Sequence, residues 1–393
     1  MLHNKTVVLG VTGSVAAYKA VDIASKLKQA GVHLEVLMTD SAQRFVTSLT
    51  FRAVANCQPV TSMWDMAGEF SVEHVSLAKI ADVILIAPAT ANTIARLAYG
   101  FADDIVCSTV LATKAPVIIA PAMNCNMYEN AATQENIQKL KDRGIIVIEP
   151  ESGHLACGTE GKGRLAATDT ILDTVRLILA RGGELAGKTV VITAGGTREP
   201  LDPVRYISNR SSGKMGYALA AAARDRGAVV KLISTVYMPQ TPGIELTRVE
   251  SAAEMLKAVT SAVKGAHALI MAAAVADYKP STVAADKIKK DAATFDLKLE
   301  PTSDILTEVK GDFIRVGFAA ESRDLIENAK KKLVAKHLDL VVANDITAPG
   351  SGFGADTNKV TLLFKDGRVE DLPLMSKRDV AERVMEGLAP IRA

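Results

Sequence analysis

Short apolar runs rich in Val and Ile alternate with helical stretches along the whole chain, and no other feature constrains the fold as strongly. Strands that are buried on both faces, as in a parallel sheet, have this composition. Gly31, Gly144 and Gly227 follow helical stretches, at positions where glycine commonly ends a helix. The alternation predicts open parallel sheets with crossover helices, with strands at 6–11, 32–38, 83–87, 117–120 and 145–148, and again at 188–193, 229–234, 268–273, 314–318 and 338–343.

The alternation is interrupted at 181–187, where the sequence reads RGGELAG. A chain of 393 residues is long enough for about two to three domains. After the interruption the pattern restarts, and near its end the strands 360–364 and 368–372 predict a hairpin. We therefore predict an α/β protein of two doubly wound, Rossmann-like domains, over 1–181 and 187–393.

Composition excludes several classes of protein. The net charge is +2, so nothing predicts nucleic-acid binding. No apolar run reaches the ~18 to 20 residues of a membrane span, and no secretory signal precedes the first strand, so we expect a cytoplasmic protein without a membrane partner. The four cysteines lack metal-ligand spacing, which suits a reducing compartment. We expect Cys57, Cys107 and Cys125 to be small apolar fillers.

A long polar stretch, residues 193–216, joins a strand to an alanine-rich helix in the second domain. A loop of about twenty residues inside a compact domain is usually functional or disordered. Gly213 and Lys214 begin the helix, where free N–H groups attract phosphate. Glycines let the backbone approach a ligand and basic side chains suit an anionic one; the residues concerned are Gly195, Gly196, Arg198, Arg205, Arg210 and Lys214. The alternative is a long, solvated surface loop.

Three polar loops follow strands of the first domain, on the carboxyl edge of its sheet, where open α/β sheets bind ligands. The first, GVTGS at 10–14, lacks the full dinucleotide fingerprint but suits one phosphate, so a mononucleotide is favoured. Hydroxyl and amide groups in the other loops can bind a ring edge or a ribityl chain. The candidate cofactor residues are Gly13, Ser14, Thr39, Ser41, Pro88, Thr90, Asn92 and Thr93.

Three further residues of the first domain are candidates for catalysis. His74 precedes a mainly apolar segment, although a lone histidine is more often structural. Asn124 stands in APAMNCNM directly after a strand, where an asparagine is often only a helix cap. Cys157 lies in the glycine-rich sequence SGHLACGTEGKGR, which suits a mobile lid. A loop cysteine is more often reactive than a buried one, and an unremarkable thiol is the alternative.

These motifs resemble those of two enzyme families. His74 before IADVILIAPATAN, followed by PAMNCNM and HLACGTEGKGR, is similar to the homo-oligomeric flavin-containing cysteine decarboxylases. The sequences TREPLDPVRYISNRSSGKMG, AAAVADYKP and KIKK resemble phosphopantothenate–cysteine ligase. Nearly the whole chain resembles the bacterial bifunctional family that carries both activities and makes 4′-phosphopantetheine on the route to coenzyme A.

The resemblance implies an FMN-dependent decarboxylase in the first domain. In that family FMN oxidises the cysteinyl thiol of the substrate to a thioaldehyde, carbon dioxide leaves, and the reduced flavin returns its hydride. His74 would be the active-site base, Asn124 would bind the substrate carboxylate, and Cys157 would protonate the enethiolate.

For the second domain, the resemblance implies a ligase that uses CTP. CTP activates 4′-phosphopantothenate as an acyl-cytidylate, and the nitrogen of cysteine then attacks the acyl carbon. Lys287 would serve the first step and Asn209 the second, while Asp277 would hold Mg²⁺. Arg205 and Arg210 would bind the phosphate of phosphopantothenate. The implied nucleotide contacts are Met271, Ala272, Ala273, Asp277, Ser303, Asp304, Ile305, Leu306, Phe318, Lys332 and Lys336.

On the residues alone, plainer explanations stay open. The run KIKK at 287–290 suits a solvated charge run, and Asp277 suits a helix cap or a turn. Lys332 and Lys336 share a helical face, which fits a triphosphate and a solvated surface equally well. The family has a proline–aspartate pair where this chain has Ser303-Asp304, which puts the local turn in doubt.

The resemblance also implies a homo-oligomer, a dodecamer in which decarboxylase trimers combine with ligase dimers. One rival hypothesis is a flavin-dependent decarboxylase or prenyltransferase acting on aromatic acids, but such chains are short and lack the 193–216 and KIKK motifs. A second is a regulatory flavoprotein that binds a protein phosphatase. Such relatives can lack a catalytic residue or carry acidic tails, whereas this chain has His74, Asn124 and Cys157 and no acidic tail.

Overall fold

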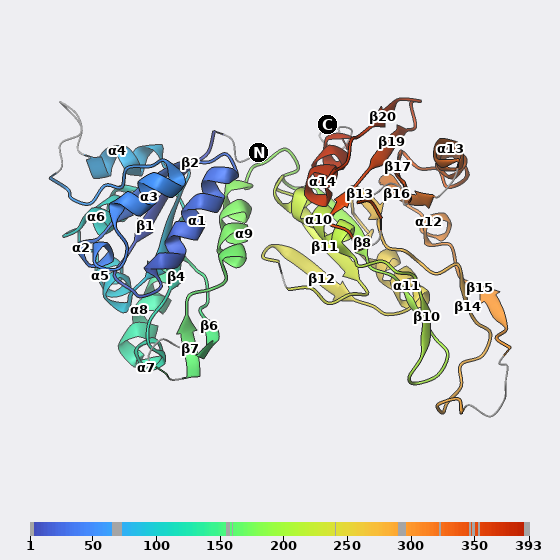
Figure 1. Ribbon diagram of the computed structural model, residues 1–393, viewed down its shortest axis with the longest axis horizontal. Coiled ribbons are helices and arrows are strands. Elements are labelled where there is room, and N and C mark those ends of the chain that lie inside the picture. Colours follow the sequence, from blue (N-terminus) through green and yellow to red (C-terminus); the bar gives the residue numbers. More distant parts are fainter. Residues whose placement is uncertain are drawn as a thin grey trace. The chain divides into compact units, whose positions relative to one another are not determined.

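The computed structural model describes residues 4–64, 73–154, 158, 160–239, 241–289, 296–321, 324–345, 347, 350–352 and 354–388. The chain divides into two compact units, Met1–Leu179 and Ala180–Ala393, and each is described by itself (Figure 1).

The first unit is built on a sheet of parallel strands in the order β2-β1-β3-β4-β5. Each strand lies where the sequence predicted one: β1 (Thr6–Val11), β2 (His33–Met38), β3 (Val83–Ala89), β4 (Val117–Pro121) and β5 (Ile146–Val147). The helices are α1 (Ala17–Gln29), α2 (Asp40–Gln43), α3 (Ser48–Ala55), α4 (Glu73–Ile80), α5 (Ala91–Tyr99), α6 (Ile105–Ala112), α7 (Cys125–Glu129), α8 (Ala131–Asp142) and α9 (Thr168–Leu179). A separate antiparallel pair consists of β6 (Glu151–His154) and β7 (Glu160–Arg164).

Alternate residues of β1 face two different layers of helices. Val7 and Leu9 pack against α1, α3 and α9, of which α1 and α9 lie side by side in Figure 1. Val8 faces the other layer, which is formed by α4, α5, α6 and α8. Both faces of the sheet are therefore covered, which explains why its strands are continuous apolar runs.

The second unit contains a mixed sheet in the order β12-β11-β8-β13-β16-β17-β19-β20, in which the pairs from β12 to β17 are parallel. The hairpin predicted at 360–372 is confirmed, because β19 pairs antiparallel with both β17 and β20. The strands are β8 (Thr189–Ala194), β11 (Val229–Ser234), β12 (Ile244–Arg248), β13 (Ala268–Met271), β16 (Ile314–Glu321), β17 (Leu340–Asp345), β19 (Val360–Phe364) and β20 (Val369–Asp371).

Helices cover both faces of this second sheet as well. One layer consists of α10 (Lys214–Arg224) and α14 (Lys377–Glu386). The other consists of α11 (Ala252–Ala262), α12 (Ile305–Glu308) and α13 (Leu325–Ala335). Small antiparallel pairs complete the unit: β9 (Arg198–Pro200) with β10 (Tyr206–Ser208), β14 (Tyr278–Pro280) with β15 (Leu299–Pro301), and β18 (Thr357–Asn358) with β21 (Met375–Ser376).

Two glycine-rich stretches are more ordered than the sequence suggested. The stretch 193–216 is not one continuous loop, because β9 and β10 form a hairpin within it. In the stretch 152–164, which the sequence favoured as a mobile lid, the two described ends pair as β6 and β7. In both cases local backbone hydrogen bonding replaces the long loop. The start of α10 after Gly213 is confirmed.

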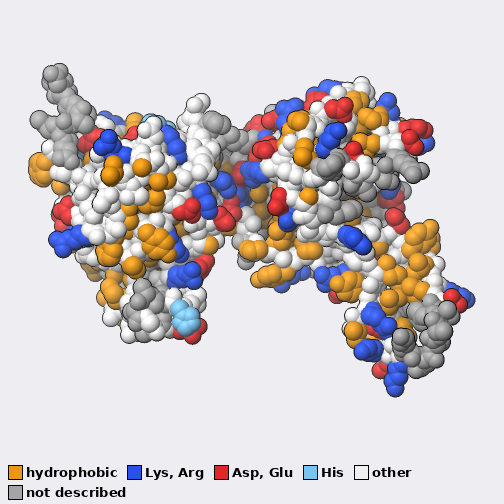
Figure 2. Space-filling model, in the orientation of Figure 1, with side chains coloured by type: hydrophobic (Ala, Val, Ile, Leu, Met, Phe, Trp, Pro, Cys, Tyr) orange, Lys and Arg blue, Asp and Glu red, His pale blue; other side chains and the backbone are white. Residues whose placement is uncertain are grey.

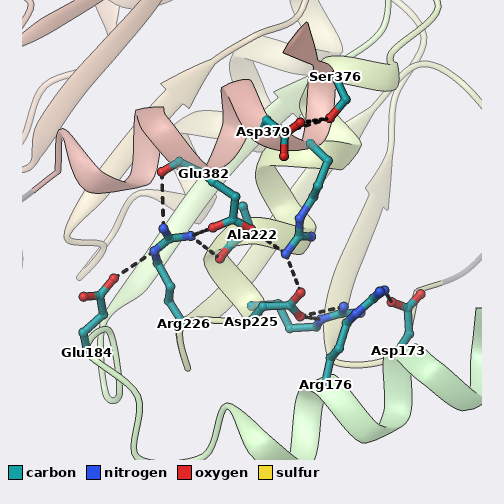
Figure 3. A network of polar contacts seen from close by, with 11 residues as sticks. Asp173, Arg176, Glu184, Ala222, Asp225, Arg226, Ser376, Asp379 and Glu382 are labelled. Atoms are coloured by element: carbon teal, nitrogen blue, oxygen red, sulfur yellow. Dashed lines mark hydrogen bonds and ion pairs between the residues drawn. The ribbon is translucent and has the colours of Figure 1, made fainter. Parts of the chain in front are cut away.

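A buried arginine fixes the start of the second unit to its last helix (Figure 3). Arg226, which follows α10, is 2% exposed, and it forms ion pairs with Glu184 over 2.8 Å and with Glu382 of α14. It also donates hydrogen bonds to the carbonyl oxygens of Ala222 and Glu382. A buried guanidinium is tolerated only when its donors find acceptors, and here both carboxylates and carbonyls supply them.

The surface shows no single dominant sign of charge on the face in Figure 2, where acidic and basic side chains are interspersed over both units. Within the described part of the chain, no helix is both long enough and apolar enough to cross a bilayer.

Candidate active sites

A cavity of about 620 Å³ opens at the carboxyl edge of the first sheet. It is lined by residues of all three polar loops that the sequence singled out, namely Gly13, Ser14, Thr39, Ser41, Thr90, Asn92 and Thr93. Ligand cavities in proteins typically have volumes of roughly 300–1,000 Å³ and a few placed polar groups. The predicted juxtaposition of the loops is therefore present.

Threonines shape these loops by capping helices and by joining strand ends. Thr39 accepts a hydrogen bond from Ala42 N–H at the start of α2, and Thr90 accepts one from Thr93 N–H at the start of α5. The buried hydroxyl of Thr12 donates to the carbonyl oxygen of Pro88 over 2.7 Å and accepts from Thr90 N–H over 3.1 Å. These bonds hold the ends of β1 and β3 in one fixed arrangement.

Gly13 is needed because its loop passes very close to α2. A Cβ atom at this position would lie 2.4 Å from the Cβ of Ser41, closer than carbon atoms can approach. The loop at 10–14 and the first turn of α2 therefore meet with no space for a side chain between them. Pro88 does not line the cavity, and its part in the structure is the carbonyl that binds Thr12.

Sequence reasoning missed the far wall of this cavity. Arg96 of α5 forms ion pairs with Asp103 and Asp104, over 3.3 and 2.9 Å, and all three residues line the cavity. Asp104 also caps α6 by accepting from Cys107 N–H. An aspartate before an apolar helix is a recognisable cap signal, but its pairing with Arg96 depends on a turn between two helices. Other lining residues that were not predicted are Thr61, Ser62, Met63, Trp64, Met123 and Met127.

His74 lines a neighbouring cavity of about 540 Å³, which shares Met63 and Trp64 with the first. Its Nδ1 atom is buried and has no hydrogen-bond partner among the described residues. A buried, unsatisfied imidazole nitrogen is unusual for a structural histidine and suits a group that meets a substrate.

Asn124 lines a third cavity of about 320 Å³, which shares Ser14 and Met123 with the first. Its Oδ1 accepts from Asn126 N–H over 2.9 Å, so the residue does cap α7. The capping role and the predicted substrate role are compatible, because the cap uses the Oδ1 acceptor, whereas a carboxylate would bind to the Nδ2 donor.

The hairpin β6–β7 rests directly on the Asn124 loop. Met123 N–H donates to the carbonyl oxygen of Gly163 over 3.0 Å. A Cβ at Gly163 would lie 2.3 Å from Met123 O, and one at Gly161 would lie 2.7 Å from the Cβ of Cys125. The alternating glycines of this strand thus permit close contact with the loop.

Glu149 ties the hairpin to the two helices beside it. It forms ion pairs with Lys162 of β7 and Lys141 of α8, and accepts from the hydroxyl of Tyr128 in α7. The hydrogen bond from Lys162 is the largest of several effects that lower the pKa of Glu149 to about 2.

The cysteines divide into two groups. Cys57, Cys107 and Cys125 are buried, as expected for apolar fillers, and burial raises the pKa of Cys57 and Cys107. Cys157, the candidate proton donor, lies outside the described residues.

The second unit has a cavity of about 590 Å³ at the carboxyl edge of its own sheet. Most of the implied nucleotide residues line it: Met271, Ala273, Asp277, Ser303, Asp304, Ile305, Leu306, Phe318, Lys332 and Lys336, together with Asn209 and Arg210. Ala272 lines an adjoining cavity of about 110 Å³, which we call the small cavity. The sequence did not predict Ser208, Val275, Ala276, Thr302 or Ala320, which also line the larger cavity.

Asn209 shapes the loop that follows β13. Its Nδ2 donates to the carbonyl oxygens of Ala274 and Val275, each over 3.2 Å. The same loop is held from the other side, because Ala276 N–H donates to the buried hydroxyl of Thr197 over 2.9 Å. The backbone of the 193–216 stretch thus supports one wall of the cavity.

The two lysines of α13 lie at the cavity in different ways. Lys332 Nζ donates to the carbonyl oxygen of Phe318 over 2.5 Å, and Lys336 forms an ion pair with Asp304 over 2.8 Å. Burial disfavours the charged form of Asp304, but the interactions with Lys336 outweigh it and lower the pKa of this carboxyl. Asp304 therefore has a cationic partner at the cavity although Ser303 stands where the family has proline.

Lys287 and Arg205 do not line the larger cavity. Arg205 instead binds the buried carboxylate of Asp202 over 2.6 Å and the carbonyl oxygen of Ile288 over 2.7 Å. Asp202 accepts in turn from Ile288 N–H over 3.2 Å. Burial opposes ionisation of Asp202, but these hydrogen bonds outweigh it and lower its pKa. The segment of Lys287 is therefore anchored to the turn at 202–205.

Asp277 is an exposed residue at the rim of the larger cavity. Within the described ranges, a close group of three candidate metal ligands consists of Asp103, Asp104 and Cys107, in the first unit. The ion pairs of Arg96 occupy both carboxylates there, and Cys107 is buried as a thiol with a raised pKa.

Comparisons with known proteins cover both units. Residues 1–179 match the family model described as Flavoprotein, and residues 185–391 match the model described as DNA/pantothenate metabolism flavoprotein C-terminal domain. The coenzyme A biosynthesis bifunctional protein CoaBC of Bacillus subtilis is 48% identical over 398 residues, covering 100% of this chain and 98% of the relative. The chain belongs to the CoaBC family.

Other members show the same extent of similarity. CoaBC of Escherichia coli K12 is 43% identical over 394 residues, covering 98% of this chain and 97% of the relative. A crystal structure of the C-terminal domain of a CoaBC protein is 39% identical, with a TM-score of 0.46, and covers 53% of this chain and 97% of that chain.

Membership of the CoaBC family confirms the resemblance read from the motifs. The chain is a bifunctional enzyme of coenzyme A biosynthesis with one flavoprotein domain and one domain of the ligase type. Both rival hypotheses fall, because the similarity to CoaBC proteins extends over the whole chain and includes both domains.

Proposed function

We propose that the first unit binds FMN in the 620 Å³ cavity and decarboxylates 4′-phosphopantothenoylcysteine. The support is the convergence of three polar loops on one sheet edge, with donors on Ser14, Thr39, Ser41, Thr90 and Asn92. The close approach of Gly13 to Ser41 makes a narrow cradle of the kind that takes a phosphate at a βα turn. Bound there, FMN supplies a reversible acceptor for the hydride that the substrate thiol carbon gives up.

The protein's own groups bind the substrate and move protons. Asn124 would hold the carboxylate that leaves as carbon dioxide, and His74 would act as base while the thiol is oxidised. Cys157 would return a proton to the enethiolate. A Cys157→Ser variant should therefore release carbon dioxide but stall before product, with ligation unchanged because the ligase site lies in the other unit.

His74 and Asn124 line separate cavities of one chain, although each cavity adjoins the flavin cavity. This separation supports an active site shared between subunits. Exposed apolar side chains lie beside His74, among them Trp64 at 83% and Leu111 at 62%, and they suit contact with a second copy. The oligomer we propose is a dodecamer, in which decarboxylase trimers combine with ligase dimers.

The second unit would join 4′-phosphopantothenate to cysteine in the 590 Å³ cavity. A carboxylate oxygen of the substrate attacks the α-phosphorus of CTP and pyrophosphate leaves. The cysteine amine then attacks the acyl carbon, loses a proton and expels CMP. Lys287 would neutralise charge at phosphorus, Asp277 would hold Mg²⁺ with the phosphates, and Asn209 would hold the acyl-cytidylate.

Lys332, Lys336 and the backbone of 303–306 would hold the nucleotide in this cavity. Arg210 also lines it and would bind the phosphate of phosphopantothenate, whereas Arg205 would do so only if its bonds to Asp202 and Ile288 opened. The substrates are metabolites of the cytoplasm, where we place the enzyme.

The observation that carries this proposal is a lined cavity at the carboxyl edge of each sheet. The test combines a flavin absorbance spectrum of the purified protein with a turnover assay for CTP, phosphopantothenate and cysteine. We expect a yellow protein that releases pyrophosphate only when CTP is the nucleotide. A colourless protein that cannot be reconstituted with FMN would disprove the first half, and turnover without CTP would disprove the second.

A further inference from the structure

The strands β13 and β16 part at the end of the sheet where the larger ligase cavity lies. β13 ends at Met271, whereas β16 continues past the last residues that the two strands pair. The chain after β13 stays beside the segment that follows β8, through a parallel bridge between Gly196 and Ala274. Residues from both sides of the opening line the cavity, among them Val275 and Ala320.

The chain after β13 has one backbone donor that the protein does not use. Ala274 N–H donates to the carbonyl oxygen of Gly195 over 2.8 Å, and Ala276 N–H donates to the hydroxyl of Thr197 over 2.9 Å. The N–H of Val275, which lies between them, has no hydrogen-bond partner among the described residues. Because Val275 lines the cavity, this N–H can bind a ligand there.

The direction of the Val275 N–H follows from the geometry of the peptide bond. In a trans peptide, the C=O group and the N–H group that follows it point to opposite sides. The peptide between Ala274 and Val275 is trans, and the carbonyl oxygen of Ala274 accepts from Thr197 N–H over 3.2 Å. Val275 N–H therefore points away from the β8 side of the sheet, towards the side on which β16 lies.

Asn209, to which the proposed function assigns the acyl-cytidylate, has no N–H left to give it. Its Nδ2 carries two hydrogens and donates to two carbonyl oxygens, those of Ala274 and Val275, each over 3.2 Å. Asn209 can thus offer the intermediate only its Oδ1 acceptor. The acyl oxygen gains negative charge when the amine attacks, and stabilising that charge requires a donor.

We propose that the N–H of Val275 is the oxyanion donor of the second ligase step, and that Thr197 is the residue that positions it. The inference rests on the proposed ligase function and names the group that receives the developing charge. When the nitrogen of cysteine attacks the acyl carbon, an electron pair of the C=O bond moves to the oxygen, which Val275 N–H binds. The C=O bond then re-forms as the bond to CMP breaks, and the nitrogen loses a proton to water.

Thr197 can position this donor because it holds both peptide groups beside it. Its hydroxyl accepts from Ala276 N–H, its own N–H donates to the carbonyl oxygen of Ala274, and the residue is fully buried. Thr197→Val keeps the shape and the backbone bond but removes the acceptor for Ala276, whereas Thr197→Ser keeps the hydroxyl. Thr260→Val is the matched control, because the hydroxyl of Thr260 bonds within its own helix, α11.

Single turnovers of the full-length protein with CTP and phosphopantothenate, with and without cysteine, separate the two steps. In Thr197→Val we expect pyrophosphate release at the wild-type rate and amide formation slowed about 10- to 100-fold, so that acyl-cytidylate accumulates although cysteine is present. Thr197→Ser should restore amide formation, and Thr260→Val should leave both steps unchanged. A loss of structure alone would slow both steps together.

Val275→Pro removes the donor itself. Proline lacks the N–H, and no hydrogen bond among the described residues is lost with it. We expect amide formation to fall about 10²- to 10³-fold while pyrophosphate release continues. Thermal melting shows which variants are folded, and Thr197→Val with its rescue by Thr197→Ser decides if Val275→Pro is not.

Two results would overturn the proposal. One is amide formation at the wild-type rate in folded Val275→Pro or Thr197→Val protein. The other is an equal slowing of pyrophosphate release and amide formation, which would place the donor at a phosphate of CTP. Absence of CTP-dependent turnover in the wild type is a different outcome, because it would overturn the proposed ligase function and this inference with it.

Discussion

The guanidinium of Arg205 donates a hydrogen bond to the carbonyl oxygen of Ile288 over 2.7 Å, across a sequence separation of 83 residues. Asp202, whose side chain is fully buried, accepts from both Arg205 and Ile288 N–H. Lys287 is the residue directly before Ile288 in the chain. If Lys287 serves the ligase as proposed, its position depends on the turn at 202–205.

Replacing Asp202 by Asn should impair the first ligase step more than nucleotide binding. The variant loses the charge that holds both Arg205 and Ile288, so Lys287 is no longer positioned. Misplacing a catalytic group by about 1 Å costs roughly 100-fold in rate, and we expect a 10- to 100-fold loss in kcat for pyrophosphate release. The KM for CTP should change little. Asp366→Asn, at an exposed turn, is the control, and equal loss in both variants would contradict the positioning role.

Lys287 and Asn209 should act at successive steps of one reaction. Lys287→Gln removes a charge needed while pyrophosphate leaves, so acyl-cytidylate should not form, with a rate loss of about 10²- to 10³-fold. Asn209→Asp places a carboxylate against the carbonyl oxygens of Ala274 and Val275, but leaves the positive charge of Lys287 in place. It should release pyrophosphate in a first turnover and make little amide. Single turnovers with labelled CTP, with and without cysteine, test the order in which the two residues act. Accumulation of acyl-cytidylate in Lys287→Gln would show that this order is wrong.

Gly13→Val should reduce flavin affinity without unfolding the first unit. The new side chain would meet Ser41, where even a Cβ lies 2.4 Å from its neighbour. Overpacking of this kind costs about 1–3 kcal/mol, which corresponds to roughly 10- to 100-fold in the dissociation constant of FMN. Gly100→Ala is the matched control, because its φ of 75° causes backbone strain but nothing lies within 4 Å. Similar flavin loss in both variants would show that strain, and not the cradle, is responsible.

The contact between Glu149 and Lys162 should weaken in acid. The pKa of Glu149 is lowered from 4.5 to about 2, so its carboxylate stabilises the folded state fully above pH 4.5. This contribution is lost as the pH falls from 4.5 towards about 2. Amide hydrogen exchange in residues 160–164 should therefore gain protection over that window as pH rises. Glu149→Gln should remove the pH dependence; if it persists, another carboxyl controls the hairpin.

Removing the charge of Arg226 should destabilise the second unit alone. In Arg226→Met the carboxylates of Glu184 and Glu382 lose their shared partner, but both are partly exposed. We therefore expect a loss of about 2 kcal/mol, below the usual cost of breaking a fully buried pair, or roughly 4–8 °C in the melting temperature of this unit. Flavin release, which reports on the first unit, should occur at an unchanged temperature. Arg383→Met, at an exposed pair with Glu386, should shift neither transition.

Features set by local composition could be predicted from the sequence, and those set by distant contacts could not. The strands of both sheets other than β12, the start of α10 and the placement of Thr39 and Thr90 at one cavity follow from apolar runs and from the geometry of parallel sheets. The pairing of Arg96 with Asp104 and the anchoring of Ile288 to Asp202 were missed, because each depends on a tertiary turn. We predicted a loop where the structure has the hairpin β6–β7, because glycines usually indicate a flexible chain. In this hairpin the glycines instead permit close contact with another segment.

Thr12 joins Pro88 and Thr90 through a single buried hydroxyl, and the cavity behind it is completed by residues as far along the chain as Met127. This order has a consequence for biosynthesis. A growing polypeptide that ends before Met127 has the loop at 10–14 but lacks part of the lining of the cavity. On the ribosome, this cavity can therefore be complete only once the chain has emerged through Met127.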